Sequence, residues 1–316
     1  MRRPWLAATA IILAGITTSY SATAAETGDI ARLRAEALEL VNRTRSEQGL
    51  GTLEPDESLD AAAQAHAQDM LERGYYAHVS PDGSTVQDRY RAQGGSRWKI
   101  VAENLARCEG CRTPPTLERL RGFHEGWMES PGHRENILRK GLRSFGFGIV
   151  AGENKIYAVQ TFAGPGSPSP SEQGEKTAPL SPEEQAARAL DAINSAREAE
   201  GLDPLARSEA LDRVANRILA EGDSGSGAIG TPRSIPALLP ADEARAWRGI
   251  STVAARCGGC GTAPTAADIR RFSDQWLESS RYRNTLLGPG ASHLGFAMRA
   301  TGDGRKTAVA VVGRRR

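Results

Sequence analysis

The feature that most constrains this sequence is an internal repeat whose period is the size of a domain. A shift of 149 residues places 106–111 (ARCEGC) on 255–260 (ARCGGC), and between Ala106 and Arg134 it gives 14 identities over 29 positions. Solenoid repeats have periods of about 20–50 residues, so the longer period indicates that a whole fold has been duplicated. We therefore expect two domains with one architecture.

A segment rich in proline, serine and glycine separates the two copies. It begins at Gly164-Pro165-Gly166 and continues through polar residues to Pro182. Such a composition favours an extended linker, because it offers few side chains that can be buried in a core. The predicted organisation is a first copy over 26–164, a linker over 165–181 and a second copy over 182–316.

The first 25 residues have the layout of a secretory signal peptide. Arg2 and Arg3 precede an apolar run from Trp5 to about Ile16, and small residues follow up to Ala25. The run is shorter than the roughly 20 apolar residues that span a bilayer. We expect cleavage and secretion to an extracellular or periplasmic location, with no transmembrane anchor left afterwards. A retained N-terminal anchor is the alternative.

The charge balance argues against nucleic acid as a partner. The chain has 40 basic and 38 acidic residues, and loss of Arg2 and Arg3 with the signal peptide leaves 38 of each. Binding to phosphates requires a basic surface, which a neutral chain does not favour. The expected partner is an extracellular ligand or protein of unknown identity.

Hydrophobic periodicity predicts helices early in each copy and strands late. In the first copy, Leu33 to Val41, Leu59 to Met70 and Leu117 to Trp127 have helical spacing. Two later runs, Phe145 to Val150 and Ile156 to Phe162, are rich in β-branched and aromatic residues. This order predicts an α+β fold in which helices pack on a small antiparallel sheet.

Several motifs of the first copy occur together in a specific order. They are Leu59-x-x-Ala62-Ala63-x-x-His66-Ala67-x-x-Met70, Tyr76-Ala77-His78, 102–106 (AENLA), 127–138 (WMESPGHRENIL), Gly146-Phe147-Gly148 and Gln160-Thr161-Phe162. In this order they resemble the CAP superfamily of cysteine-rich secretory, antigen 5 and pathogenesis-related proteins, and most closely its bacterial SCP-like branch. The second copy resembles it through the repeat, with eroded motifs.

The resemblance implies an α-β-α sandwich with an open cleft, in which His78, Glu103 and His133 converge. In some relatives such a cluster binds a divalent metal. The family's second cleft carboxylate usually stands three residues after the tryptophan of the third helix, where this chain has Ser130. Glu125 and Glu129 are the carboxylates nearest to that position.

The second copy serves as an internal control for these residues. Cys108, Cys111, Trp127, Glu129 and Arg134 all have identical counterparts, which indicates a structural role. The three residues of the candidate site do not: the counterpart of His78 is the segment 223–227 (DSGSG), that of Glu103 is Thr252 and that of His133 is Tyr282. Their joint loss favours a shared task in the first copy.

Two imidazoles and a carboxylate are a sufficient ligand set for zinc or another divalent metal. The same three residues without a metal would hydrogen-bond a polar ligand, and a structural role for His133 or Glu103 is the competing interpretation. Outside this trio, we interpret His66 as a core histidine and His124 as a surface residue. Asn104 and Asn136 are expected to tie loop backbone together.

The four cysteines form two Cys-x-x-Cys motifs in equivalent loops of the two copies. Zinc ribbons place two such motifs about 15–20 residues apart, which does not match this spacing. In an exported chain, local disulfides Cys108–Cys111 and Cys257–Cys260 are favoured. They would stiffen the loop after Glu103 and its counterpart.

Three functions remain open at this point. The first is a non-enzymatic extracellular binding module that uses the cleft of the first copy for a lipid-like ligand, a peptide or a protein partner. The second is a metal-dependent hydrolase with His78, Glu103 and His133 as ligands and Glu125 or Glu129 as base. The third is a purely structural envelope protein, which the selective loss of site residues in the second copy disfavours.

Overall fold

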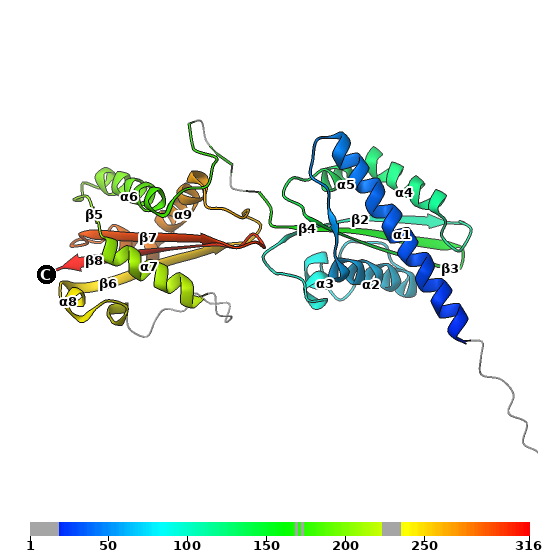
Figure 1. Cartoon of the computed structure of the whole chain (residues 1–316), viewed down its shortest axis with the longest axis horizontal. Coiled ribbons are helices and arrows are strands. Elements are labelled where there is room, and N and C mark those ends of the chain that lie inside the picture. Colours follow the sequence, from blue (N-terminus) through cyan, green and yellow to red (C-terminus); the bar gives the residue numbers. More distant parts are fainter. Residues whose placement is uncertain (1–18, 168–169, 172–173, 223–234) are drawn as a thin grey trace, which may run out of the picture.

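The structure is a computed structural model that describes residues 19–167, 170–171, 174–222 and 235–316 (Figure 1). Residues 1–18, which hold most of the predicted signal peptide, lie outside the described part of the chain. The segment 223–227, predicted as the counterpart of His78, also lies outside it. Among the described residues, no helix is long and apolar enough to cross a membrane.

The first copy contains five helices and four strands within the described part of the chain. The helices are α1 (Ser19–Glu47), α2 (Glu57–Arg73), α3 (Val86–Ala92), α4 (Leu117–Glu129) and α5 (Pro131–Ile137). The strands are β1 (Glu54–Pro55), β2 (Ile100–Glu109), β3 (Ser144–Gly152) and β4 (Lys155–Gly164). The predicted helices and late strands are therefore confirmed, whereas β1, β2, α3 and α5 were not predicted.

The four strands form one sheet in the order β1-β3-β4-β2. β4 pairs antiparallel with β3 and β2, and only the short β1 pairs in parallel. The turn between β3 and β4 has positive φ at both Glu153 and Asn154, as a tight two-residue hairpin turn requires. On the other side of β4, Glu103 of β2 lies opposite Thr161.

Helices cover both faces of this sheet, which gives the α-β-α sandwich (Figure 1). Alternate residues of β3, such as Phe145 and Phe147, point into a core shared with α1 and α4. The opposite face packs against α2, where Ala63 and Met70 meet Val159 of β4. The predicted fold class is thus confirmed.

The approach of α2 to the sheet depends on glycine. A Cβ atom on Gly146 would lie 2.3 Å from the carbonyl carbon of Leu59, and one on Gly148 would lie 2.3 Å from the backbone nitrogen of Gln64. The second copy keeps the first of these positions as Gly295, whose Cβ would meet Leu211 at 2.2 Å. Both sheets therefore hold their helix at backbone contact distance.

The second copy repeats the architecture of the first. Its helices are α6 (Pro182–Ala199), α7 (Glu209–Gly222), a 3-10 turn (Ile235–Leu238), α8 (Ala241–Ala244), α9 (Ala266–Glu278) and α10 (Ser280–Leu286). Its strands are β5 (Ala206–Arg207), β6 (Trp247–Cys257), β7 (His293–Ala300) and β8 (Lys306–Arg315), in the order β5-β7-β8-β6. The order matches that of the first sheet strand for strand.

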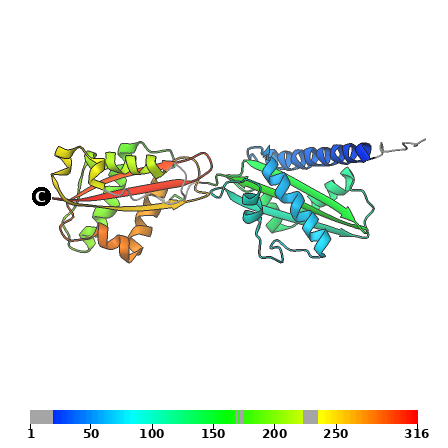
Figure 2. The same ribbon diagram turned by 90° about the horizontal axis from the view of Figure 1, so that it is seen from below.

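The two copies lie end to end, as the turned view shows (Figure 2). Part of the predicted linker contacts the second copy. Leu180 is buried in its core, and Arg270 of α9 binds the Pro170 carbonyl at 3.0 Å and the Glu175 carboxylate at 2.8 Å. The segment therefore contributes more to packing than its composition indicates.

Both cysteine pairs form local disulfides, Cys108–Cys111 and Cys257–Cys260, as predicted. In each pair the first cysteine lies at the end of a strand, β2 or β6, and the second lies in the loop before the helix that follows, α4 or α9. The backbone nitrogen of the second cysteine donates to the turn of the neighbouring hairpin, from Cys111 to Asn154 and from Cys260 to Gly304. Each disulfide thus occupies the equivalent position within its own domain.

Candidate functional site

The loop that carries His78 is anchored to α2 by His66. His66 is fully buried, and one of its ring nitrogens, Nε2, lies 3.0 Å from the carbonyl oxygen of Ala77. The other, Nδ1, lies 3.3 Å from the hydroxyl of Tyr75. Burial lowers the pKa of His66, and the charge of Glu103 opposes that effect. The interpretation of His66 as a core histidine agrees with these contacts, and His66 also fixes the backbone next to His78.

Glu103 lies at the centre of the candidate site. It is 5% exposed, on β2, and His78 Nδ1 lies 2.9 Å from its Oε1. A carboxylate only accepts hydrogen bonds, so Nδ1 must donate and the neutral ring keeps its acceptor at Nε2. The side chain of His78 is 56% exposed. The pair therefore presents a fixed hydrogen-bond acceptor at the protein surface.

Arg89 of α3 binds the second oxygen of the same carboxylate. Its Nη2 donates to Glu103 Oε2 at 2.8 Å and to the His78 carbonyl at 3.0 Å. Its Nη1 donates to the Ser84 carbonyl at 2.9 Å. The guanidinium thus compensates the charge of Glu103 and ties the loop that carries His78 and Ser84 to α3.

Sequence reasoning missed Arg89. A buried carboxylate needs a cationic or hydrogen-bonding partner, but the sequence did not predict that Glu103 is buried. Nothing in the sequence identified which arginine it was, because α3 is a single short helix without apolar periodicity. The helix begins with a capping box between Thr85 and Asp88, which was the one local signal available.

His133 approaches the site from α5 without joining the Glu103 hydrogen bonds. Its carbonyl accepts from Asn104 Nδ2 at 3.1 Å, and Asn136 donates to the Glu103 carbonyl, also at 3.1 Å. Burial lowers the pKa of His133, and the nearby imidazole of His78 lowers it further. The two imidazoles are thus near enough to interact electrostatically, and the two asparagines tie the backbone together as expected.

The arrangement does not fit a divalent metal as it stands. Among the described residues, no group of three or more His, Cys, Asp and Glu side chains is placed to hold a metal ion. Both oxygens of Glu103 are engaged, and the guanidinium of Arg89 lies within 2.8 Å of one of them. A cation at that distance opposes a second one. Zinc binding remains a prediction that only a titration can test.

The carboxylates considered as catalytic bases lie elsewhere. Glu125 and Glu129 are exposed on α4. Glu125 lines a cavity of about 710 Å³ beside Cys111, with Arg112 and Arg119 on its walls. The interpretation of His124 as a surface residue is wrong: it is 7% exposed and its Nε2 lies 3.0 Å from the hydroxyl of Thr44. It packs between α4 and α1.

Equivalent residues of the second copy show what the scaffold requires. The side chain of Asn42 bonds both backbone groups of Leu53, and Asn194 does the same with Leu205. Two further pairs keep their hydrogen-bond partners in the same way, namely Arg45 and Arg197, and Asp60 and Asp212. These polar residues are structural.

The polar residues of the site are replaced as a set. The sheet registers align Glu103 with Thr252, Asn104 with Val253 and Gln160 with Ala310. The helices align His66 with Ile218, His133 with Tyr282 and Asn136 with Thr285. The second copy therefore has apolar or weakly polar side chains where the first has histidines, amides and a carboxylate.

The fold and site define a tandem of α-β-α sandwich domains of which the first alone carries a buried Glu103 held by histidine and arginine. The chain belongs to the CAP family, the cysteine-rich secretory protein family, whose model matches residues 38–162 and 190–313. Both matches lie within the predicted copies.

Two proteins of Bacillus subtilis (strain 168) are similar in sequence. The uncharacterized protein YkwD is 33% identical over 142 residues, which cover 45% of this chain and 51% of YkwD. The uncharacterized membrane protein YlbC is 30% identical over 127 residues, covering 40% of this chain and 33% of YlbC. The chain thus matches about half of the first relative and a third of the second.

A solved structure of an extracellular SCP-domain protein from Bacillus anthracis is 25% identical to this chain. The match covers 47% of this chain and 44% of that protein, with a TM-score of 0.36.

Proposed function

We propose that this chain is exported and acts as a non-enzymatic binding module whose first copy holds its ligand at His78, Glu103 and His133. Membership of a family named for secretory proteins and the layout of residues 1–25 support export. The proposed ligand is a lipid-like molecule, a peptide or a partner protein that presents a hydroxyl or N–H group to His78.

The observation that carries this proposal is the selective replacement of the site in the second copy. Scaffold residues such as Asn194 and Asp212 keep the hydrogen bonds of their first-copy counterparts. Glu103 and His133 have become Thr252 and Tyr282. A purely structural role would call for these residues in both copies.

The chemistry of the site favours binding over hydrolysis. Glu103 is committed to His78 and Arg89, so it orients the imidazole and has no free oxygen to activate water. Hydrolysis at a metal site requires an acid or base beside the metal-bound water. Ser130 stands where the family usually has a second carboxylate, and Glu125 lines the cavity beside Cys111.

Thermal unfolding with two probes tests the proposal. Oleate and trialanine represent the lipid-like and peptide classes, and a ligand at 100 times its dissociation constant stabilises the native state by about 2.7 kcal/mol. We expect at least one probe to raise the melting temperature of the full chain. The double variant His78→Ala/His133→Tyr should lose this shift, and Tyr282→Ala in the second copy should keep it.

A shift that survives in His78→Ala/His133→Tyr would place binding elsewhere and refute the site. If neither probe shifts the melting temperature, lipid-like molecules and peptides are excluded as ligand classes. Zinc chloride is titrated in the same assay. Stabilisation by zinc that depends on both histidines would favour the metal-dependent alternative.

A further inference from the structure

The two copies meet through a small set of tight contacts. From the first copy, the segment Ser96–Ile100, which leads from α3 into β2, faces the second copy, and Pro165 and Gly166 at the start of the predicted linker do so as well. From the second copy come the disulfide loop Cys257–Gly261 and the β7–β8 turn Thr301–Arg305. Figure 1 shows these parts at the junction of the two sheets.

Backbone groups make the closest of these contacts. Gly259 N donates to the Trp98 carbonyl at 2.6 Å, and Gly261 N donates to the Pro165 carbonyl at 2.9 Å. Gly166 and Cys260 form an isolated antiparallel bridge. The disulfide loop of the second copy therefore pairs with the first copy on two sides.

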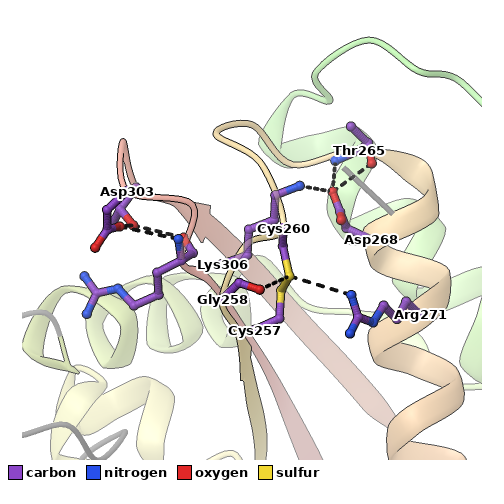
Figure 3. The surroundings of a disulfide bond; sticks show 10 residues. Cys257, Gly258, Cys260, Thr265, Asp268, Arg271, Asp303 and Lys306 are labelled. Carbon is purple, nitrogen blue, oxygen red and sulfur yellow. Dashed lines mark hydrogen bonds and ion pairs between the residues drawn. A yellow bond between two sulfur atoms is a disulfide. The ribbon is translucent and has the colours of Figure 1, made fainter. Parts of the chain in front are cut away.

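Side chains add to the contact around Trp98. The hydroxyl of Ser96 donates to Asp303 Oδ2 at 2.9 Å. The guanidinium of Arg305 lies 5.5 Å from the centre of the Trp98 ring, within the range of a cation–π interaction. Asp303 lies in the turn beside the disulfide (Figure 3).

Three glycines leave no space for side chains at this junction. A Cβ atom would lie 1.9 Å from the Gly259 carbonyl oxygen if placed on Gly166, and 2.3 Å from Ile100 Cγ2 if placed on Gly259. A Cβ atom on Gly304 would lie 2.1 Å from the Pro165 carbonyl oxygen. All three have positive φ, so both their conformation and their contacts call for glycine.

The contacted segment connects the two residues that bind each other in the site. Arg89 lies on α3, before the segment, and Glu103 lies on β2, three residues after Ile100. Ser96 also links to α3 directly, because its carbonyl accepts from Gln87 Nε2 at 3.5 Å. The second copy therefore contacts the chain segment that runs from Arg89 to Glu103.

We infer that the second copy is a docking domain that fixes the segment Ser96–Ile100 and so holds Arg89 in place on Glu103. This role would explain why a copy that has lost its own site keeps its disulfide loop, with Gly259 at the position of Gly110. It goes beyond the proposed binding function, because the positions of Arg89 and Glu103 are set in this way whatever ligand the site takes.

The chain offers a matched pair of variants to test this. Gly110 and Gly259 occupy equivalent positions between the cysteines, with φ of 70° and 68°. A Cβ atom on Gly110 would meet nothing within 4 Å, whereas one on Gly259 would meet Ile100. Gly110→Ala and Gly259→Ala therefore share the backbone strain and differ in the contact between domains.

The measurement is the rate of hydrogen exchange in the full chain. NMR monitors this rate at the Arg89 guanidinium and at the amides of Ser96–Ile100. We expect Gly259→Ala to speed exchange at these groups about tenfold or more, and Gly110→Ala to change it less than twofold. The melting temperature of each variant reports its global stability. A purely structural effect of the added methyl group would lower the melting temperature of both variants.

Equal exchange rates in the two variants would overturn the inference, as would the absence of any change in Gly259→Ala. If Gly259→Ala does not fold, Ser96→Ala decides the question, because it removes only a hydroxyl that bonds Asp303 and the Trp98 nitrogen. Faster exchange at Arg89 in Ser96→Ala supports the inference, and unchanged exchange refutes it.

Discussion

Arg89 on α3 donates from Nη2 to Oε2 of Glu103 on β2 over 2.8 Å. The side chain of the arginine is 10% exposed and that of the glutamate 2% exposed, so the pair is shielded from solvent on both sides. His78 occupies the other carboxylate oxygen. The loop, the helix and the edge strand of the sheet are joined at this one carboxylate.

Replacing Arg89 by alanine should therefore destabilise the first copy strongly. Removing one partner of a buried ion pair leaves the other charge uncompensated, which costs about 3–5 kcal/mol. Arg89→Lys keeps the charge but loses the second guanidinium nitrogen, so we expect a smaller loss. Denaturant unfolding of the full chain, followed by far-UV circular dichroism, measures both.

Arg91 supplies the control for this prediction. It lies on the same helix, and its side chain is 52% exposed at 3.9 Å from Asp88. An exposed ion pair contributes about 0–1 kcal/mol, so Arg91→Ala should change stability little. If Arg89→Ala and Arg91→Ala have the same small effect, the Arg89–Glu103 pair does not stabilise the fold.

The sequence predicted the parts of the fold that depend on periodic patterns. The helices through Leu59 to Met70 and Leu117 to Trp127 and the strands after Phe145 have regular apolar spacing, and the structure contains all of them. β2 escaped prediction because its central residues, Glu103 and Asn104, are polar but buried. A strand that carries a site breaks the alternation by which strands are found.

The candidate site was predictable only as a list of residues. The family resemblance named His78, Glu103 and His133, and the comparison of the two copies supported them. The structure brings the first two into contact. It links His133 to the site through its carbonyl, which accepts from Asn104, and through the effect of His78 on its pKa. The pairing of Arg89 with Glu103 depends on where the short helix α3 packs. The local side-chain types and their spacing do not determine that position.

The stability of the first copy should fall when the pH drops below about 6.5, the ordinary pKa of histidine. Burial lowers the pKa of His66 in the folded state, so the unfolded chain binds a proton that the folded chain excludes. Stability then increases with pH across the window between the lowered pKa and the ordinary one. One such group contributes a slope of at most about 1.4 kcal/mol per pH unit.

His66→Gln tests this assignment, because glutamine retains a donor for the Ala77 carbonyl and does not titrate. Unfolding free energies at pH 7.5, 6.5 and 5.5 should show a shallower slope in the variant than in the wild type. The remaining slope is expected to come from His124 and His133, whose pKa values are also lowered by burial. An unchanged slope would show that His66 is not the titrating group.

Limited proteolysis should separate the two copies within the predicted linker. Lys176 is exposed between the copies, whereas Leu180 is buried in the second copy. We expect trypsin to cut first at Lys176 and to leave two fragments that resist further digestion. Mass spectrometry identifies the fragments. First cuts inside α2 or α9 would contradict the proposed boundaries.

N-terminal sequencing of the protein exported from its native host tests the signal peptide. Cleavage after Ala25 predicts a mature chain that begins at Glu26. An intact N-terminus on membrane-bound protein would favour the retained anchor.

The second copy contains a buried ion pair between its sheet and α9. Lys306 of β8 is fully buried and binds Asp268 of α9, which is 1% exposed (Figure 3). Asp268 also accepts from the backbone and hydroxyl of Thr265 at the start of α9. The sheet registers place Ile156 of the first copy at the position of Lys306, opposite the first cysteine of the motif.

Asp268→Ala should therefore destabilise the second copy by about 3–5 kcal/mol, because it leaves the Lys306 ammonium buried without this carboxylate. Burial already lowers the pKa of Lys306, and Asp268 opposes that effect. Adding Lys306→Ile, the residue of the first copy, should recover most of the loss, since a well-packed apolar side chain replaces a buried charge. A remaining deficit of about 1 kcal/mol is expected from the lost cap on α9. Denaturant unfolding of the two variants against wild type measures the recovery. If the double variant is no more stable than Asp268→Ala, the cost comes from the cap and from packing, and the buried charge is not its cause.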